Sequence, residues 1–228
     1  MSEIGQGLSK AIELIISLDR EVMEIAARSL RISLTSTILA SLICLPLGSL
    51  IHFRHFRGKR VVINLIQTFF SLPTVVVGLF IFVLLSRAGP LGELGLLFTP
   101  TAMVAGQMVL ITPILLGLTI SAVSGVDPAI VDTARSLGAS GFQTATVVLR
   151  EARFAVVAAV IMGFGRAISE VGISLMVGGN IRGFTRVITT AISLETSRGD
   201  LELSLALGII LILIALVINL ALNRLQQR

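Results

Sequence analysis

Residues 203–222 read LSLALGIILILIALVINLAL and carry no charge. A helix needs about 20 consecutive apolar residues to cross the roughly 30 Å hydrocarbon core of a bilayer, so this stretch predicts a transmembrane helix. The whole chain has the same character, because 54% of its 228 residues are hydrophobic and only 14% are charged. A soluble fold could not cover so much apolar surface. The sequence therefore predicts an all-α integral membrane protein.

Four further apolar runs precede this one. The predicted spans, about five in number, are Ile32–Ile51, Val61–Ser86, Leu96–Val123, Phe154–Val177 and Leu203–Leu222. Together they make residues 32–228 a transmembrane domain with no room for a soluble catalytic domain. Residues 1–31 are too charged to span and are predicted to form an N-terminal interfacial helix on the external side. Pro46, Pro73 and Pro113 fall inside the first three spans, where kinks are expected.

The charges of the connections predict the orientation. Residues 54–60 follow the first span and hold three arginine residues and a lysine without an acid, which places them in the cytoplasm by the positive-inside tendency. Alternation along the chain then puts residues 127–153 and the C-terminus in the cytoplasm and the N-terminus outside.

Several function classes are excluded by composition and motif. The net charge of +5 is not gathered into a basic patch with aromatic residues, and the chain has no Trp or Tyr, so we expect no nucleic-acid partner. The single cysteine, Cys44, is expected to pack inside a span, and His52 and His55 are isolated from other ligands, so no metal site is predicted. The chain lacks a phosphate-binding loop, an HExxH motif and a GxSxG motif. We therefore assign no catalytic residue and do not expect an enzyme.

The connection at residues 127–153 has the signals of a helical hairpin. Asp127 can cap a short helix that begins at Pro128, and Gly138 can take the left-handed conformation that ends it. Ser140 can then cap a second helix that runs into the fourth span. On shape alone, this could be an ordinary cytoplasmic hairpin.

The residues of this hairpin favour a more specific interpretation. Asp132-Thr133-Ala134, three residues and Gly138, followed by Ala139-Ser140, resemble the EAA loop of permeases in binding-protein-dependent ABC importers. Asp-Thr replaces the family's Glu-Ala, and residues 148–151 lack its usual proline. The resemblance implies the MetI-like permease fold, with a cytoplasmic hairpin that couples to an ATPase subunit. The candidate coupling residues are Asp132, Thr133, Ala134, Arg135, Leu137, Gly138, Ala139 and Ser140.

A second stretch narrows the resemblance. Residues 164–172, FGRAISEVG, and 177–183, VGGNIRG, are similar to tungstate, molybdate and sulfate permeases and look closest to the tungstate type. This implies a prokaryotic inner-membrane protein that forms a homodimer with two cytoplasmic ATPase subunits and an external oxyanion-binding protein. ATP and Mg would be bound by the ATPase, and this chain would need no cofactor. A molybdate or sulfate permease, and a membrane scaffold without transport activity, are the alternatives.

Two sets of polar residues are candidates for contact with the substrate or its carrier. Arg166 and Glu170 are four residues apart in the fourth span, where an unpaired charge costs on the order of 3 kcal/mol or more, so we expect them to pair. They would either gate the pathway or bind neighbouring helices. Asn180, Arg182 and Arg186 lie in the external loop, as contacts for the anion or the binding protein or as solvated residues.

Overall fold

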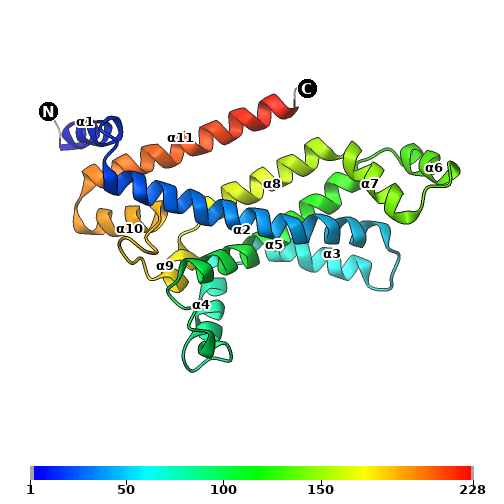
Figure 1. Ribbon diagram of the computed structural model, residues 1–228, viewed down its shortest axis with the longest axis horizontal. Coiled ribbons are helices and arrows are strands. Elements are labelled where there is room, and N and C mark those ends of the chain that lie inside the picture. Colours follow the sequence, from blue (N-terminus) through cyan, green and yellow to red (C-terminus); the bar gives the residue numbers. More distant parts are fainter. Residues whose placement is uncertain (1–2, 227–228) are drawn as a thin grey trace.

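The computed structural model describes residues 3–226, and all regular structure within them is helical (Figure 1). The helices are α1 (Glu3–Ile16), α2 (Arg20–Phe53), α3 (Lys59–Thr68), η1 (Phe69–Ser71), α4 (Thr74–Leu85), η2 (Gly92–Leu94), α5 (Pro100–Ser124), α6 (Pro128–Ser136), α7 (Gly141–Glu151), α8 (Arg153–Ile168), α9 (Gly172–Gly178), α10 (Ile188–Arg198) and α11 (Leu201–Gln226). The all-α prediction is confirmed. The end of the basic tail, with Arg228, lies outside the described residues.

The N-terminal region divides differently from the predicted boundary at residue 31. Helix α1 ends at Ile16, and α2 begins at Arg20 and continues without a break through the first predicted span. Asp19 causes this restart, because its side chain accepts a hydrogen bond of 3.0 Å from the backbone N–H of Val22. Residues 20–31 are therefore the first turns of the first membrane helix and not a separate helix.

Two of the predicted spans are broken. Helices α2, α5 and α11 are each long and apolar enough to cross a membrane, whereas α3–η1 meets α4 at 100° and α8 meets α9 at 58°. The three unbroken helices and the two bent pairs together make up to five spans. Pro73 stands at the first break, where it lacks the N–H that would continue the helix. Pro46 and Pro113, in contrast, lie inside continuous helices.

Helix α5 is at the centre of the bundle and packs against α2, α3, α8 and α9. The core where α2, α3, α5 and α8 meet consists of Ala40, Cys44, Ile66, Ile111, Leu115, Leu116, Ile120 and Ala167. Close approach of α2 and α5 depends on Gly48, since a Cβ there would lie 3.0 Å from the side chain of Thr119. Apolar side chains on the other face of α2, such as Leu42 at 68% exposure, point away from the bundle as expected for a lipid-facing surface.

The long helices lie lengthwise in Figure 1 and separate two ends of the molecule. Helices α6 and α7 and the turn between α2 and α3 lie at one end, and α1 and α10 lie at the other. Helix α11 starts next to α10 and runs back toward the α7 end, with α1 packed against it. The candidate coupling hairpin and the basic connection at residues 54–60 thus share one end.

Candidate functional site

The hairpin α6–α7 has the caps that its sequence predicts. The Asp127 carboxylate accepts a hydrogen bond of 2.9 Å from the N–H of Ala129, and Pro128 is the first residue of α6. Gly138 ends the turn with φ +79°, the left-handed region in which glycine has no Cβ penalty. These three predictions are confirmed.

The second helix of the hairpin starts with a reciprocal pair of hydrogen bonds. The N–H of Gln143 donates to Ser140 Oγ at 3.3 Å, and the N–H of Ser140 donates to Gln143 Oε1 at 2.8 Å. This capping box satisfies two backbone donors at once and fixes the angle at which α7 leaves the turn. A turn at Ala152 then separates α7 from α8, so the predicted continuous helix into the fourth span is two helices.

The tip of the hairpin exposes both charge and apolar surface. Asp132, Thr133 and Arg135 are exposed on α6, and within residues 3–226 neither Asp132 nor Arg135 takes part in an ion pair. Leu137 and Phe142 are each 83% exposed on either side of the turn. Two large apolar side chains held in the open by a capped hairpin are typical of a surface that a partner protein or the membrane covers.

Arg166 and Glu170 form the predicted ion pair. Arg166 Nη1 lies 2.9 Å from Glu170 Oε2, with the glutamate side chain 1% exposed and the arginine side chain 33% exposed. The other carboxylate oxygen of Glu170 accepts a hydrogen bond of 2.9 Å from the N–H of Ile173. The backbone carbonyl of Glu170 accepts a hydrogen bond of 2.7 Å from the hydroxyl of Thr189. Glu170 therefore holds the break between α8 and α9 together and ties it to α10.

Arg182 and Arg186 of the external loop are paired with acids on α2 and α10. Arg182 Nε donates to Glu21 at 2.9 Å, and this hydrogen bond raises the pKa of Arg182. Arg186 is buried and lies 3.2 Å from Glu195 and 3.8 Å from Glu21. These pairs fasten the start of α2 to the loop before α10. The arginine charges are thus compensated within the chain.

Asn180 is also held by the protein. Its backbone has φ +50°, and its side-chain amide donates a hydrogen bond of 3.2 Å to the carbonyl of Thr190. The structure brings Arg182 and Arg186 together through Glu21, and it places Asn180 on the adjacent turn.

One buried polar network was missed in the sequence. Ser36 Oγ donates to Gln107 Oε1 at 2.7 Å, and Gln107 Nε2 donates to the carbonyl of Ala167 at 3.1 Å. The network joins α2, α5 and the end of α8 close to the α8–α9 break. The single glutamine of the third predicted span was the signal that could have found it, because an amide side chain needs a partner in the membrane.

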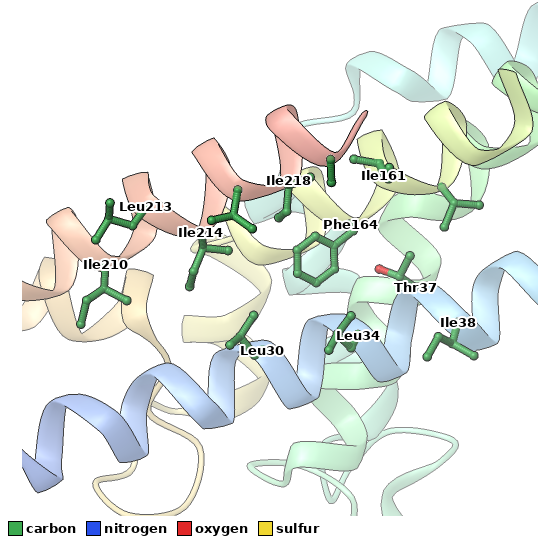
Figure 2. A pocket seen from close by; sticks show the side chains of 13 residues that line it. Leu30, Leu34, Thr37, Ile38, Ile161, Phe164, Ile210, Leu213, Ile214 and Ile218 are labelled. Carbon is green, nitrogen blue, oxygen red and sulfur yellow. The ribbon is translucent and has the colours of Figure 1, made fainter. Parts of the chain in front are cut away.

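A cavity of about 610 Å³ lies between α2, α8 and α11 (Figure 2). Phe164, Leu34 and Ile214 point into it from the three helices, and Thr37 is the polar residue of its lining. The Thr37 hydroxyl donates to the carbonyl of Ser33 in its own helix at 2.7 Å. The described residues that line it offer an anion no charge and no free side-chain donor, so this cavity suits apolar chains rather than an oxyanion. Among residues 3–226, no three His, Cys, Asp or Glu side chains are placed to hold a metal ion.

Comparison with known proteins identifies the family of this chain. Residues 44–228 match the family described as the binding-protein-dependent transport system inner membrane component. The chain belongs to this family. It is therefore a membrane component of a transport system, as the EAA-like loop indicated.

Relatives and a solved structure agree with this family. The chain is 40% identical to the tungstate uptake system permease protein TupB of Peptoclostridium acidaminophilum, with 100% of both chains covered. It is 38% identical to the TupB protein of Campylobacter jejuni, with 98% of this chain and 94% of that protein covered. A structure titled as inward-facing conformations of the MetNI methionine ABC transporter superposes with a TM-score of 0.72 at 19% identity and covers 98% of this chain and 97% of that one. The predicted permease fold is confirmed.

Proposed function

We propose that this chain is the membrane-spanning permease subunit of an ATP-driven importer for tungstate. The full-length similarity to two tungstate uptake permeases supports the substrate. The observation that carries the mechanism is the hairpin α6–α7, which is capped at both starts and turns at a left-handed glycine. A short stiff helix can transmit the movement of an ATPase cleft to the spans that follow it.

The proposed orientation places this hairpin in the cytoplasm. The basic connection at residues 54–60 lies at the same end of the molecule as α6 and α7, and α11 runs toward that end (Figure 1). The positive-inside tendency therefore assigns the whole end to the cytoplasm and the end with α1 and α10 to the outside.

We propose that two copies of the chain enclose the pathway. The Arg166 side chain is one-third exposed on α8, in the fourth span of a single chain. A partly exposed guanidinium at membrane depth needs water or another protein chain rather than lipid next to it. A second permease copy facing α8 would supply both a protein wall and a water-filled pathway, and Arg166 with Glu170 would stand beside it.

The energy source lies outside this chain. The sequence has no phosphate-binding loop, so in this proposal two cytoplasmic ATPase subunits bind ATP and Mg and an external binding protein delivers the anion. Asp132, which lacks an ion-pair partner within residues 3–226, is a charged group that the ATPase would meet on α6. The chain itself works by conformational coupling and holds no cofactor.

Competition in whole cells tests the substrate. Cells that produce the permease with its ATPase and binding protein should take up tungstate, and excess molybdate or sulfate should inhibit less than excess unlabelled tungstate. Stronger inhibition by molybdate or sulfate would assign the chain to that substrate. Normal tungstate uptake in cells that lack the permease, together with copurification of the ATPase with the permease from cells that produce it, would favour a scaffold.

A further inference from the structure

A hollow of about 600 Å³ lies where the end of α2 meets the hairpin. This volume falls within the range of about 300–1,000 Å³ that is typical of small-molecule sites. Its apolar wall comes from α2 and α7 and consists of Pro46, Leu50, Phe53, Phe142 and Leu149. The α2 part of this wall extends along the first membrane helix to its last turn.

Two arginines supply the charge of this hollow. Among the described residues that line it, Arg54 and Arg135 are charged and no carboxylate is present. Neither arginine forms an ion pair within residues 3–226. The hydroxyls of Ser49, Thr144 and Thr146 donate to carbonyls of their own helices. Among the described lining residues, the free side-chain donors of the hollow are therefore the two guanidinium groups.

The position of the hollow selects the kind of ligand. Arg54 follows the last residue of α2, so it stands where a span leaves the membrane and a basic connection begins. A molecule at this depth meets hydrocarbon on one side and positive charge on the other. Phospholipids of the cytoplasmic leaflet have this chemistry, and basic pockets between spans on that side bind anionic headgroups.

We infer that the hollow binds an anionic phospholipid, with its phosphate paired to Arg54 and Arg135 and an acyl chain along the apolar wall. The inference rests on the cytoplasmic orientation proposed above. Because Arg54 belongs to the end of α2 and Arg135 to α6, the bound lipid links the first span to the coupling hairpin. Anionic lipid then stabilises one position of the hairpin relative to the bundle.

The absence of tryptophan from the chain permits a direct test. Phe142→Trp places a single reporter at the mouth of the hollow, where the native side chain is 83% exposed and a larger ring needs no repacking. Phe80→Trp, on the exposed face of α4, is the matched reporter away from it. Each variant is reconstituted in vesicles of equal phosphatidylcholine and phosphatidylglycerol. Bromine on an acyl chain quenches tryptophan fluorescence. In one sample phosphatidylglycerol carries the bromine and in the other phosphatidylcholine carries it, so the two samples have the same headgroup composition.

Brominated phosphatidylglycerol should quench the fluorescence of Phe142→Trp more than brominated phosphatidylcholine does. The binding preference for phosphatidylglycerol should be roughly fivefold per arginine. Both brominated lipids should quench Phe80→Trp equally. The preference should disappear when Arg54→Gln and Arg135→Gln are added and persist with Arg57→Gln, a control in the same basic connection. Equal quenching of Phe142→Trp by both lipids would overturn the inference. Loss of all quenching when the ATPase subunit is added would assign the hollow to the ATPase instead. Because the readout needs no transport, its failure is distinguishable from failure of the proposed function.

Discussion

Arg166 donates a hydrogen bond of 2.9 Å to Glu170 across the last turn of α8, and the second oxygen of the same carboxylate caps α9. The pair therefore has two roles that can be separated. The charge of Glu170 neutralises Arg166, whereas its second carboxylate oxygen stabilises the break between α8 and α9.

Mutating this pair should reveal both roles. Glu170→Ala should lower the thermal midpoint of the purified permease more than Arg166→Ala, because it also leaves the N–H of Ile173 unpaired. Glu170→Gln keeps an acceptor and should recover part of the loss. In a double-mutant cycle with Ala at both positions, we expect a coupling of about 0.5–3 kcal/mol. Strictly additive effects would mean that the two side chains act independently.

Arg186 and Arg182 should differ in their effect on stability. Arg186→Ala leaves the carboxylate of Glu195 buried with less compensation, so we expect a loss on the order of 3–5 kcal/mol. Arg182→Ala breaks an exposed pair and should change the thermal midpoint little. Uptake is measured together with the thermal midpoint, so that a loss of stability can be distinguished from a loss of contact with the anion or the binding protein. A strong loss of uptake in a fully stable Arg182→Ala protein would support a role for Arg182 as a contact for the anion or the binding protein.

Gly138→Val should uncouple the hairpin from transport. A Cβ at Gly138 meets no atom within 4 Å, so the penalty comes from φ +79° and amounts to about 1–2 kcal/mol for an L side chain. Transport should fall more than the amount of permease in the membrane. Gly141→Val, which has open space and no positive φ in the same hairpin, and Gly58→Val, which has φ +92° in another connection, are the controls. Equal losses in all three variants would remove the special status of Gly138.

Labelling of single cysteines tests the orientation. In a Cys44→Ala background, Phe184→Cys should react with a membrane-impermeant maleimide in intact cells, because that loop is predicted to be outside. Leu137→Cys, at the exposed tip of the hairpin, should react only after the membrane is opened. The reverse pattern would show that the orientation is opposite and that the hairpin α6–α7 lies outside the cell.

The elements that depend on local signals were predictable from the sequence. Helix starts at Asp127 and Ser140, the turn at Gly138 and the spacing of Arg166 and Glu170 each involve residues within four positions of one another, where capping and helix periodicity decide the geometry. The apolar runs likewise predicted about five spans, because the thickness of the bilayer sets their length, and the structure has three unbroken helices and two bent pairs that make up to five.

Features that depend on distant partners were not predictable. Arg182 pairs with Glu21, which is 161 residues away, and nothing in either neighbourhood indicates the match. The sharp bend at Pro73 is another example. A proline in a span predicts a kink, but the 100° angle depends on the packing of α4 against α9. The charged residues 20–31 looked unsuited to a membrane helix, yet Asp19 starts α2 ahead of them.

ATP-driven accumulation of tungstate in vesicles measures directly whether this chain is the permease of an ATP-driven importer. The purified permease, reconstituted with its ATPase and supplied with binding protein, should accumulate tungstate only when all three components and ATP are present. The Gly138→Val complex, at equal composition, should hydrolyse ATP with little accumulation. Accumulation that persists without ATP, or an undiminished rate in Gly138→Val, would contradict a permease driven through this hairpin.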